Sequence, residues 1–203
     1  MMTFISLMNA NLFPALVLFF SKSLLRHPLA RSNIEDFTGD SHFRWVIPDP
    51  AHESAEVAER SETYAIDAPE KIERVIICTG QAYAAIHKYR SSNKITSAAI
   101  TRVEQLNPFP WKDLKDNLDM YPNAKTIVWA QEEPLNAGPW SFMQPRIETL
   151  LNNTEHHHRK HVMYAGRAPS ASVATGLKGT HMKEEQDLLE MAFTVKQDKL
   201  KGA

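Results

Sequence analysis

The stretch RVIICTGQAYAAIHKYR, residues 74–90, decides the fold that we expect. It begins with Arg74–Cys78, an apolar run without alternation that is typical of a strand buried on both faces. Thr79 and Gly80 then provide a turn, and Gln81–Arg90 follows as a helix. The apolar side chains of this helix fall on one stripe, formed by Ala82, Ala85, Ile86 and Tyr89. The stretch therefore predicts a strand–turn–helix unit.

The same alternation continues to the end of the chain. The further strands that we expect are Phe43–Ile47, Ser97–Val103, Lys125–Ala130 and His161–Tyr164, and the further helices are Trp111–Met120, Trp140–Leu151 and Lys183–Phe193. Two of these helices have a clear apolar stripe, made by Trp111, Leu114 and Leu118 in the first and by Leu188, Leu189, Ala192 and Phe193 in the last. Strands that alternate with helices, and central strands that are apolar throughout, indicate a sheet covered on both faces. The predicted fold class is α/β, with three layers and a mostly parallel sheet.

The composition fits one globular domain and excludes several classes of protein. The chain has 203 residues, of which 43% are hydrophobic, which is enough for one core but not for several full domains. Lys and Arg number 23 and Asp and Glu 24, so no overall field favours a nucleic acid or an anionic membrane as partner. The single cysteine, Cys78, excludes an intrachain disulfide and a cysteine-only metal site. Because Cys78 lies in a predicted buried strand, we expect its thiol to be unreactive.

Two segments differ from the rest of the chain. Residues 1–20 carry no charge, but Asn9, Asn11 and Pro14 interrupt their apolar run. We favour a short buried strand at Leu16–Phe20 over a mitochondrial targeting segment or a membrane span. Residues 48–71 hold seven acidic residues and almost no large apolar ones, so we expect an exposed connection.

Two candidate sites lie where predicted strands end. Free N–H groups at Thr79-Gly80 could bind an anion at the start of the following helix, although a tight turn that needs glycine explains the same residues. Glu132 and Glu133 follow the predicted strand Lys125–Ala130, where paired carboxylates could act as acid and base or bind a cation. They could also cap a helix or pair with a basic residue across an interface, and this is the interpretation that we favour.

Four histidines form a further candidate site. His156, His157, His158 and His161 resemble a metal site at first sight. Three consecutive histidines point in different directions on any regular element, so we expect an exposed loop.

The most concentrated basic group is Lys22, Arg26 and His27. Arginine can hold a phosphate or a carboxylate with two parallel N–H groups. This group could therefore bind the phosphate of a nucleotide or an acyl-CoA, or it could form an interdomain ion pair. No glycine-rich phosphate loop and no nucleophile elbow occurs in the sequence, so we assign neither a catalytic residue nor a metal site.

Five segments, in this order and spacing, resemble one family. They are SKSLLRHPLA (21–30), RVIICTGQAY (74–83), TRVEQLNPFPW (101–111), WAQEEPLNAGPW (129–140) and YAGRAPSASVATG (164–176). Together they resemble the C-terminal domain of the thiamine-dependent first component of the 2-oxoglutarate dehydrogenase complex. The resemblance continues through KEEQDLLEMAF (183–193) and so extends from about Phe19 to Val195.

That family is built like transketolase, so the resemblance implies a transketolase C-terminal-domain-like fold for residues 19–203. Residues 1–18 are then an atypical segment, and the acidic residues at about 51–70 are a loop insertion. The family binds thiamine diphosphate and magnesium in other domains, through GDG followed by an asparagine. The nearest string here is Gly39-Asp40-Ser41, which lacks the second glycine. We therefore expect a fragment that holds no cofactor and is inactive alone.

The resemblance also implies a function and partners. The family enzyme decarboxylates 2-oxoglutarate oxidatively in the mitochondrial citric acid cycle, with partners in its other domains, its second subunit and its complex. This domain would serve dimer packing, and it would bind an acetyl-CoA or AMP effector through Lys22, Arg26, His27 and Gly80. The residues implied at interfaces are Glu132, Glu133, Trp140 and Arg167, and without its partners the domain would expose an apolar patch at Trp140 and Phe142. The location that the resemblance implies is the mitochondrial matrix. The alternative function is a stand-alone, non-enzymatic binding or assembly module.

Overall fold

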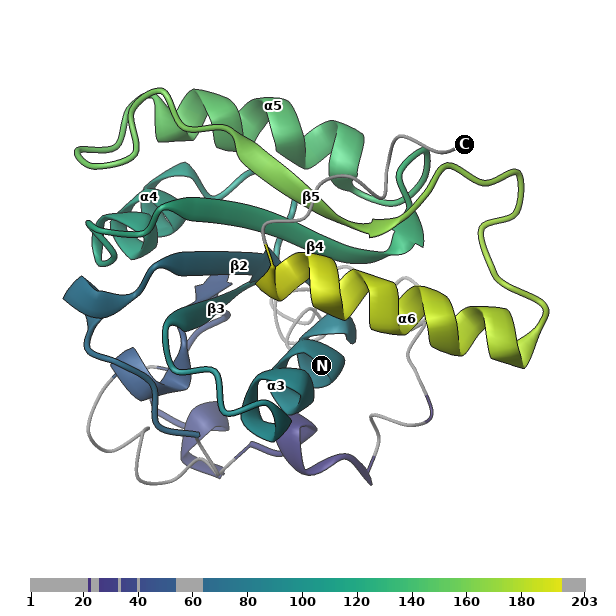
Figure 1. Cartoon of the computed structure of the whole chain (residues 1–203). Helices are drawn as coiled ribbons and strands as arrows, with labels where there is room; N and C mark the ends of the chain where they lie inside the picture. The colour runs from purple at the N-terminus through teal and green to yellow at the C-terminus, as the bar shows by residue number, and fades with distance from the viewer. Residues whose placement is uncertain (1–21, 23–25, 33, 40, 54–63, 195–203) are drawn as a thin grey trace, which may run out of the picture. The chain divides into compact units, whose positions relative to one another are not determined.

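The computed structural model describes residues 22, 26–32, 34–39, 41–53 and 64–194 (Figure 1). The chain divides into two compact units, Met1–Arg44 and Trp45–Ala203, and each is described by itself. In the first unit, the described residues include the short 3-10 helices η2 (Pro28–Ala30) and η3 (Ile34–Phe37). The predicted strand Leu16–Phe20 lies outside the described residues.

A five-stranded mixed sheet forms the middle of the second unit. Its strands are β1 (Val46–Ile47), β2 (Arg74–Cys78), β3 (Ala98–Val103), β4 (Thr126–Pro134) and β5 (Val162–Arg167). They lie in the order β1-β3-β2-β4-β5, with β1 antiparallel to β3 and the other four strands parallel. β2 is the central strand, and all five of its residues are buried, as its apolar run predicts.

Helices cover both faces of this sheet and complete three layers. The α-helices are α3 (Ala82–Ser92), α4 (Trp111–Asp119), α5 (Trp140–Leu151) and α6 (Lys178–Phe193), and the 3-10 helices are η4 (Pro50–His52) and η5 (Pro69–Lys71). α3 contacts α6 on one face, and α4 contacts α5 on the other (Figure 1). The predicted α/β class with three layers and a mostly parallel sheet is confirmed. None of the helices in the described part of the chain is long and apolar enough to cross a membrane.

The main core lies between the sheet and the helices α4 and α5. It includes Val75 and Ile77 of β2 and Trp129 of β4, and all three are fully buried. Leu114 and Leu118 of α4 pack there as their spacing predicts, and each such side chain contributes about 1.5–3 kcal/mol when it leaves water. The third member of that predicted stripe behaves differently. Trp111 is 47% exposed and packs edge-on against Phe109 instead, with 4.5 Å between ring centroids.

Several elements extend beyond the predicted limits. β4 continues through Gln131–Pro134, so the two glutamates are part of this strand and do not follow it. β5 continues to Arg167, and α6 begins at Lys178, five residues before the predicted start. The strand predicted at Phe43–Ile47 is reduced to the two residues of β1. The missed segments have little apolar periodicity, and tertiary context overrides such weak local preferences.

The prediction that residues 48–71 form an exposed connection is wrong at Asp49, which is fully buried. Its carboxylate pairs with the guanidinium of Arg90, a fully buried residue of α3. Oδ2 of Asp49 also accepts a hydrogen bond from the backbone N–H of Ile100 at 2.8 Å. Arg90 donates in turn to the carbonyl oxygen of Ala98 at 3.1 Å. β1 pairs only with residues 102 and 103 of β3, so these two side chains bind the part of β3 that β1 leaves without a strand partner.

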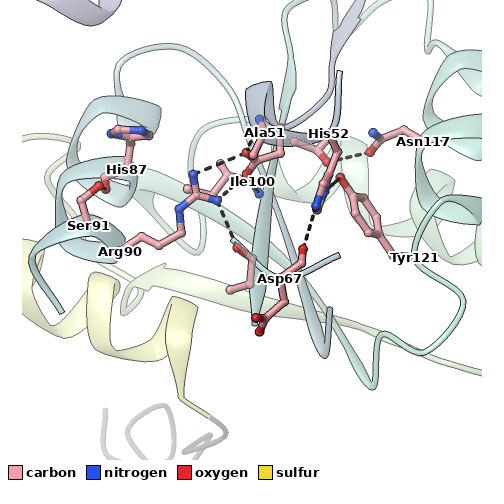
Figure 2. A network of polar contacts seen from close by, with 12 residues as sticks. Ala51, His52, Asp67, His87, Arg90, Ser91, Ile100, Asn117 and Tyr121 are labelled. Atoms are coloured by element: carbon pink, nitrogen blue, oxygen red, sulfur yellow. Dashed lines mark hydrogen bonds and ion pairs between the residues drawn. The ribbon is translucent and has the colours of Figure 1, made fainter. Parts of the chain in front are cut away.

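A second polar group fixes the two ends of the acidic segment (Figure 2). The ring of His52 contacts the hydroxyl of Tyr121 at 3.2 Å through Nδ1 and the carbonyl oxygen of Asp67 at 2.8 Å through Nε2. The hydroxyl of Thr96 donates to the carboxylate of Asp67 at 2.9 Å. Both ends therefore belong to the folded domain.

The expected exposed loop of histidines is wrong for one of them. His157 is fully buried, whereas His156, His158 and His161 are exposed. Nδ1 of His157 lies 2.9 Å from Nζ of Lys160, and Nε2 lies 3.0 Å from the carbonyl oxygen of Leu118. Because an ammonium group can only donate, Nδ1 accepts and Nε2–H donates, so the ring is neutral. Burial lowers the pKa of His157, which agrees with this assignment.

The buried pair generates a first prediction. Asp49→Asn leaves the guanidinium of Arg90 without its counter-charge inside the protein, and we expect it to lower the free energy of unfolding by about 3–5 kcal/mol. Urea unfolding measures this loss. The matched control is Lys125→Ala, which removes the ion pair of Lys125 with Glu73 at the surface and should cost at most about 1 kcal/mol. Equal losses in the two variants would contradict the role of the buried pair.

A second prediction concerns acid stability. The unfolded chain protonates His157 near pH 6.5, whereas burial lowers the pKa of His157 in the folded state. The unfolded state therefore binds more protons below about pH 6.5, so the stability from neutral His157 is complete above that pH and is lost as the pH falls through the folded pKa.

His157→Gln provides the matched comparison. A glutamine amide can donate to Leu118 and accept from Lys160 but does not titrate. Neighbouring charges, including Asp119, which raises this pKa, and Lys160 and His156, which lower it, are the same in both proteins. We expect the unfolding free energy of the variant to fall less steeply between pH 6.5 and 5 than that of the unsubstituted protein. Parallel pH profiles in urea unfolding would show that His157 does not titrate as inferred.

Candidate functional site at the carboxyl edge of the sheet

The carboxyl ends of the parallel strands bring several predicted residues to one edge of the sheet. Cys78 at the end of β2 is in register with Arg102 of β3 and with Ala130 of β4. Pro134 of β4 is in register with Arg167 of β5. The helices that follow β2 and β4 cover opposite faces of the sheet (Figure 1), so the chain diverges between these two strands. Such a switch point is where open α/β sheets place ligand sites.

Gly80 lies exposed at this switch point. Its backbone is left-handed, with φ of +61°, and a Cβ atom there would have no neighbour within 4 Å. The turn therefore requires the glycine, and no close approach of another group does. α3 begins two residues later with Gln81 at its N-cap position, and no side chain caps its first N–H groups. The tight-turn interpretation accounts for Gly80, while the start of α3 keeps N–H groups that could donate to an anion.

The two glutamates of β4 have different surroundings. Oε1 of the exposed Glu132 accepts a hydrogen bond of 2.9 Å from Nε2 of Gln81, across the switch point. Successive side chains of a strand point to opposite sides, and Glu133 packs against Gly138, where a Cβ would come within 2.8 Å of the Cβ of Glu133. The two carboxylates therefore do not converge on one point. This arrangement favours the structural interpretation over an acid–base pair.

Arg102 is a candidate that motif reasoning misses, because TRVEQ matches no binding or catalytic motif. Its guanidinium carbon lies 4.5 Å from the ring centroid of Tyr83, in the first turn of α3. Its Nη1 lies 3.7 Å from the carboxylate of Glu104. Burial raises the pKa of Tyr83, and the charge of Arg102 opposes that rise. A cation thus stands beside the start of α3, and the signal that could have found it is a basic residue near the end of an apolar parallel strand.

Arg167 joins the end of β5 to α6 and to the loop between them. Its Nε lies 2.9 Å from the carboxylate of Glu184, and its Nη1 donates to the carbonyl oxygen of Val173 at 2.8 Å. Only 11% of its side chain is exposed. The interface role implied for Arg167 stays a prediction, but within this chain the residue fixes the position of the loop.

Gln131 and Tyr164 hold the same edge from inside, and neither is in the predicted site. Gln131 is buried, accepts from the indole N–H of Trp129 at 2.9 Å and donates to the carbonyl oxygen of Ala137 at 2.8 Å. The hydroxyl of Tyr164 contacts the carbonyl oxygens of Glu133 and Arg167, both at 3.0 Å. These bonds give the loops beyond β4 and β5 a fixed backbone.

The apolar patch expected at Trp140 and Phe142 is covered in part by this chain itself. Both side chains are half-buried and pack against the main core. Trp140 lies 5.1 Å from Tyr164 between ring centroids, and the guanidinium carbon of Arg146 lies 3.6 Å from the ring centroid of Phe142. The interface role of Trp140 stays a prediction.

The predicted basic group belongs to the first unit. Lys22 and Arg26 are exposed, and His27 is half-buried. Nδ1 of His27 accepts a hydrogen bond of 3.2 Å from the backbone N–H of Leu29 and so caps η2. Gly80 belongs to the second unit, so the joint phosphate site of these four residues stays a prediction.

The remaining candidates concern a metal ion and a nucleophile. Among the described residues, no group of three His, Cys, Asp or Glu side chains is placed to hold a metal ion. Cys78 is fully buried, and burial raises the pKa of its thiol to about 12. The predicted burial of Cys78 is confirmed. Because the thiolate is the reactive form, the raised pKa supports the prediction of an unreactive thiol.

Comparisons with known proteins show which family this chain resembles. The family described as 2-oxoglutarate dehydrogenase C-terminal matches residues 31–193. The mitochondrial 2-oxoglutarate dehydrogenase of Schizosaccharomyces pombe is 50% identical over 178 residues, which are 88% of this chain and 16% of that protein. The corresponding protein of Saccharomyces cerevisiae is 43% identical over 178 residues, again 88% of this chain and 16% of the relative. That of Caenorhabditis elegans is 42% identical over 187 residues, 92% of this chain and 16% of the relative.

The chain thus spans about one sixth of the length of these relatives. Among solved structures, a split gene transketolase, described as an inactive beta4 tetramer, is similar with a TM-score of 0.42 and 15% sequence identity. The similarity covers 68% of this chain and 45% of that chain.

Proposed function

The chain belongs to the 2-oxoglutarate dehydrogenase C-terminal family, and we propose that it serves as the C-terminal domain of an enzyme for the oxidative decarboxylation of 2-oxoglutarate in the citric acid cycle. The observation that carries this proposal is the family match over residues 31–193, together with 50% identity to the fission yeast enzyme. The relatives are named as mitochondrial proteins, which supports a mitochondrial location.

In this proposal, catalysis depends on the parts of the enzyme that lie outside the region matched by this chain. The described residues do not fit a thiamine diphosphate–magnesium site, because no three potential metal ligands converge among them. The string Gly39-Asp40-Ser41 lacks the second glycine of the family signature. The only cysteine is buried, and Glu132 is engaged with Gln81. We therefore expect the chain alone to have no 2-oxoglutarate dehydrogenase activity.

The contribution of the domain is a rigid surface for dimer and domain packing. Gln131 and Tyr164 fix the backbone at the ends of β4 and β5, so the neighbouring side chains keep their positions without a partner. Ordering a surface before association lowers the entropic cost of binding. Glu132, Glu133, Trp140 and Arg167 at this edge contact the rest of the enzyme.

A third prediction tests the role as a domain. The fission yeast 2-oxoglutarate dehydrogenase is produced without the region that matches this chain and is then mixed with the chain, thiamine diphosphate and magnesium. We expect decarboxylation of 2-oxoglutarate, followed with an artificial electron acceptor, to rise at least about tenfold over the truncated enzyme. The chain alone is the control and should give no turnover.

Two other results would contradict parts of this proposal. Turnover by the chain alone would contradict its inactivity and the absence of a cofactor site. Failure of the chain to bind the truncated enzyme would contradict the domain role. In that case the stand-alone binding or assembly module is the better explanation.

The finer part of the proposal is an effector site for acetyl-CoA or AMP. The family resemblance implies Lys22, Arg26, His27 and Gly80 for its phosphate groups. Within the second unit, Arg102 adds a cation beside the start of α3, which supports an anion at that helix start.

A fourth prediction tests that site by thermal unfolding. A ligand that binds only the folded state stabilises it by mass action, so acetyl-CoA or AMP at about 100 times its Kd should raise Tm by several degrees. Arg26→Ala should abolish the shift. Arg31→Ala removes another exposed arginine of the same unit and should leave the shift intact. If neither acetyl-CoA nor AMP raises Tm, the effector site is refuted. If thiamine diphosphate and magnesium raise Tm, the absence of a cofactor site is refuted.

A further inference from the structure

Three large apolar side chains lie exposed within ten residues, between the end of β5 and the second turn of α6. Val173 is 65% exposed, Leu177 is 73% exposed and Met182 is 58% exposed. In the described part of the chain, only four large apolar side chains are more than half exposed, and three of these four concentrate here. We call Val173, Leu177 and Met182 the apolar loop surface. Concentrated exposed apolar residues mark interaction sites more often than single ones do.

The loop that carries this surface is held in place by polar contacts. Asn136, in the β4–α5 connection, exchanges two hydrogen bonds of 3.0 Å with the backbone of Ser170. Arg167 holds the carbonyl oxygen of Val173, as described above, and Glu184 of α6 binds both Arg167 and the hydroxyl of Thr175. The loop extends beyond the ends of β4 and β5 before α6 returns across the sheet (Figure 1). The structure thus orders a segment whose apolar side chains face water.

The start of α6 shows a second unmet requirement. Leu177 occupies the N-cap position, where Ser, Thr, Asp or Asn would bind the first free N–H groups, and no side chain caps the helix. The first turn contains no acidic residue, and Lys178 and Lys183 add positive charge to the positive end of the helix dipole. A partner with an acidic group beside an apolar spot would complement both features.

We propose that the apolar loop surface docks onto the larger part of 2-oxoglutarate dehydrogenase that lies outside the matched region, with a carboxylate of that part at the start of α6. This inference rests on the proposed function. The occupant follows from length and charge: this chain spans only 16% of its fission yeast relative, so in such an enzyme most of the protein is available to cover this surface. The polar contacts of Asn136, Arg167 and Glu184 then order the loop before binding. A preformed loop loses less conformational entropy on association.

The test measures binding of the chain to the fission yeast enzyme that lacks the matching region. The variant Val173→Ser, Leu177→Ser, Met182→Ser removes the apolar contacts without adding charge, and we expect its Kd to rise at least about tenfold. The matched control is Ile34→Ser, because Ile34 is an apolar residue of similar exposure, 74%, outside the surface. Its Kd should be unchanged. Far-ultraviolet circular dichroism and Tm check that both variants are folded.

A single substitution gives a sharper test, because two measured quantities should move in opposite directions. Leu177→Asp puts a helix-capping carboxylate where the backbone already has the extended N-cap conformation, so we expect Tm to rise by about 2–4 °C. The same carboxylate repels the acidic group of the partner and removes an apolar contact. We therefore expect the Kd to rise at least about tenfold although the domain is more stable.

The outcomes separate the docking surface from the proposed function. If the unsubstituted chain binds and the triple variant binds with the same Kd, the docking surface is wrong and the domain role stands. If the unsubstituted chain does not bind at all, the domain role fails, and this inference with it. If sedimentation shows a dimer of the chain that the triple variant dissociates while binding to the enzyme is unchanged, a second copy is the occupant and the proposal is overturned.

Discussion

The sheet depends on one buried ion pair, between Asp49 and Arg90. β1 is too short to cover β3, and an uncovered strand edge presents unpaired N–H and C=O groups. Here the carboxylate of Asp49 accepts from the N–H of Ile100, and the guanidinium of Arg90 donates to the carbonyl oxygen of Ala98. Two charges can leave water only if each finds several partners. The strand edge supplies one of those partners to each charge, so the same contacts close the edge and help to satisfy the buried pair.

How much of the fold follows from the sequence depends on the range of the forces involved. The bounds of β2 and α5 agree with the predictions because apolar runs and helical periodicity are local patterns. Asp49 and Arg90 are 41 positions apart, and nothing near either residue in the sequence reveals the other. From composition alone, the acidic residues 48–71 are predicted to be exposed to solvent. The burial of Asp49 and of His157 is therefore set by tertiary structure, which single-sequence patterns do not contain.

The candidate site is predictable in its place but not in its members. Alternating strands and helices already indicate that the ends of parallel strands share one edge, which is where Gly80 and Glu132 are found. The partner of Glu132 is Gln81, and the ring under Arg102 belongs to Tyr83. Those contacts depend on the position of the start of α3 relative to β3 and β4. A sequence motif reports residue types at fixed spacing. It cannot reveal these pairs, because their members come from different strands and helices.

The polar contacts of this domain also explain why one surface can stay incomplete. The start of α6 breaks two local rules at once, because Leu177 stands where a polar cap belongs and is 73% exposed. Conflicts between local preference and structure concentrate at functional positions. In a marginally folded loop, such a conflict would be relieved by a local rearrangement. Asn136 holds the loop at Ser170 and Arg167 holds it at Val173. These contacts restrain such a rearrangement, so the unmet contacts remain directed outward, where a docking partner can satisfy them.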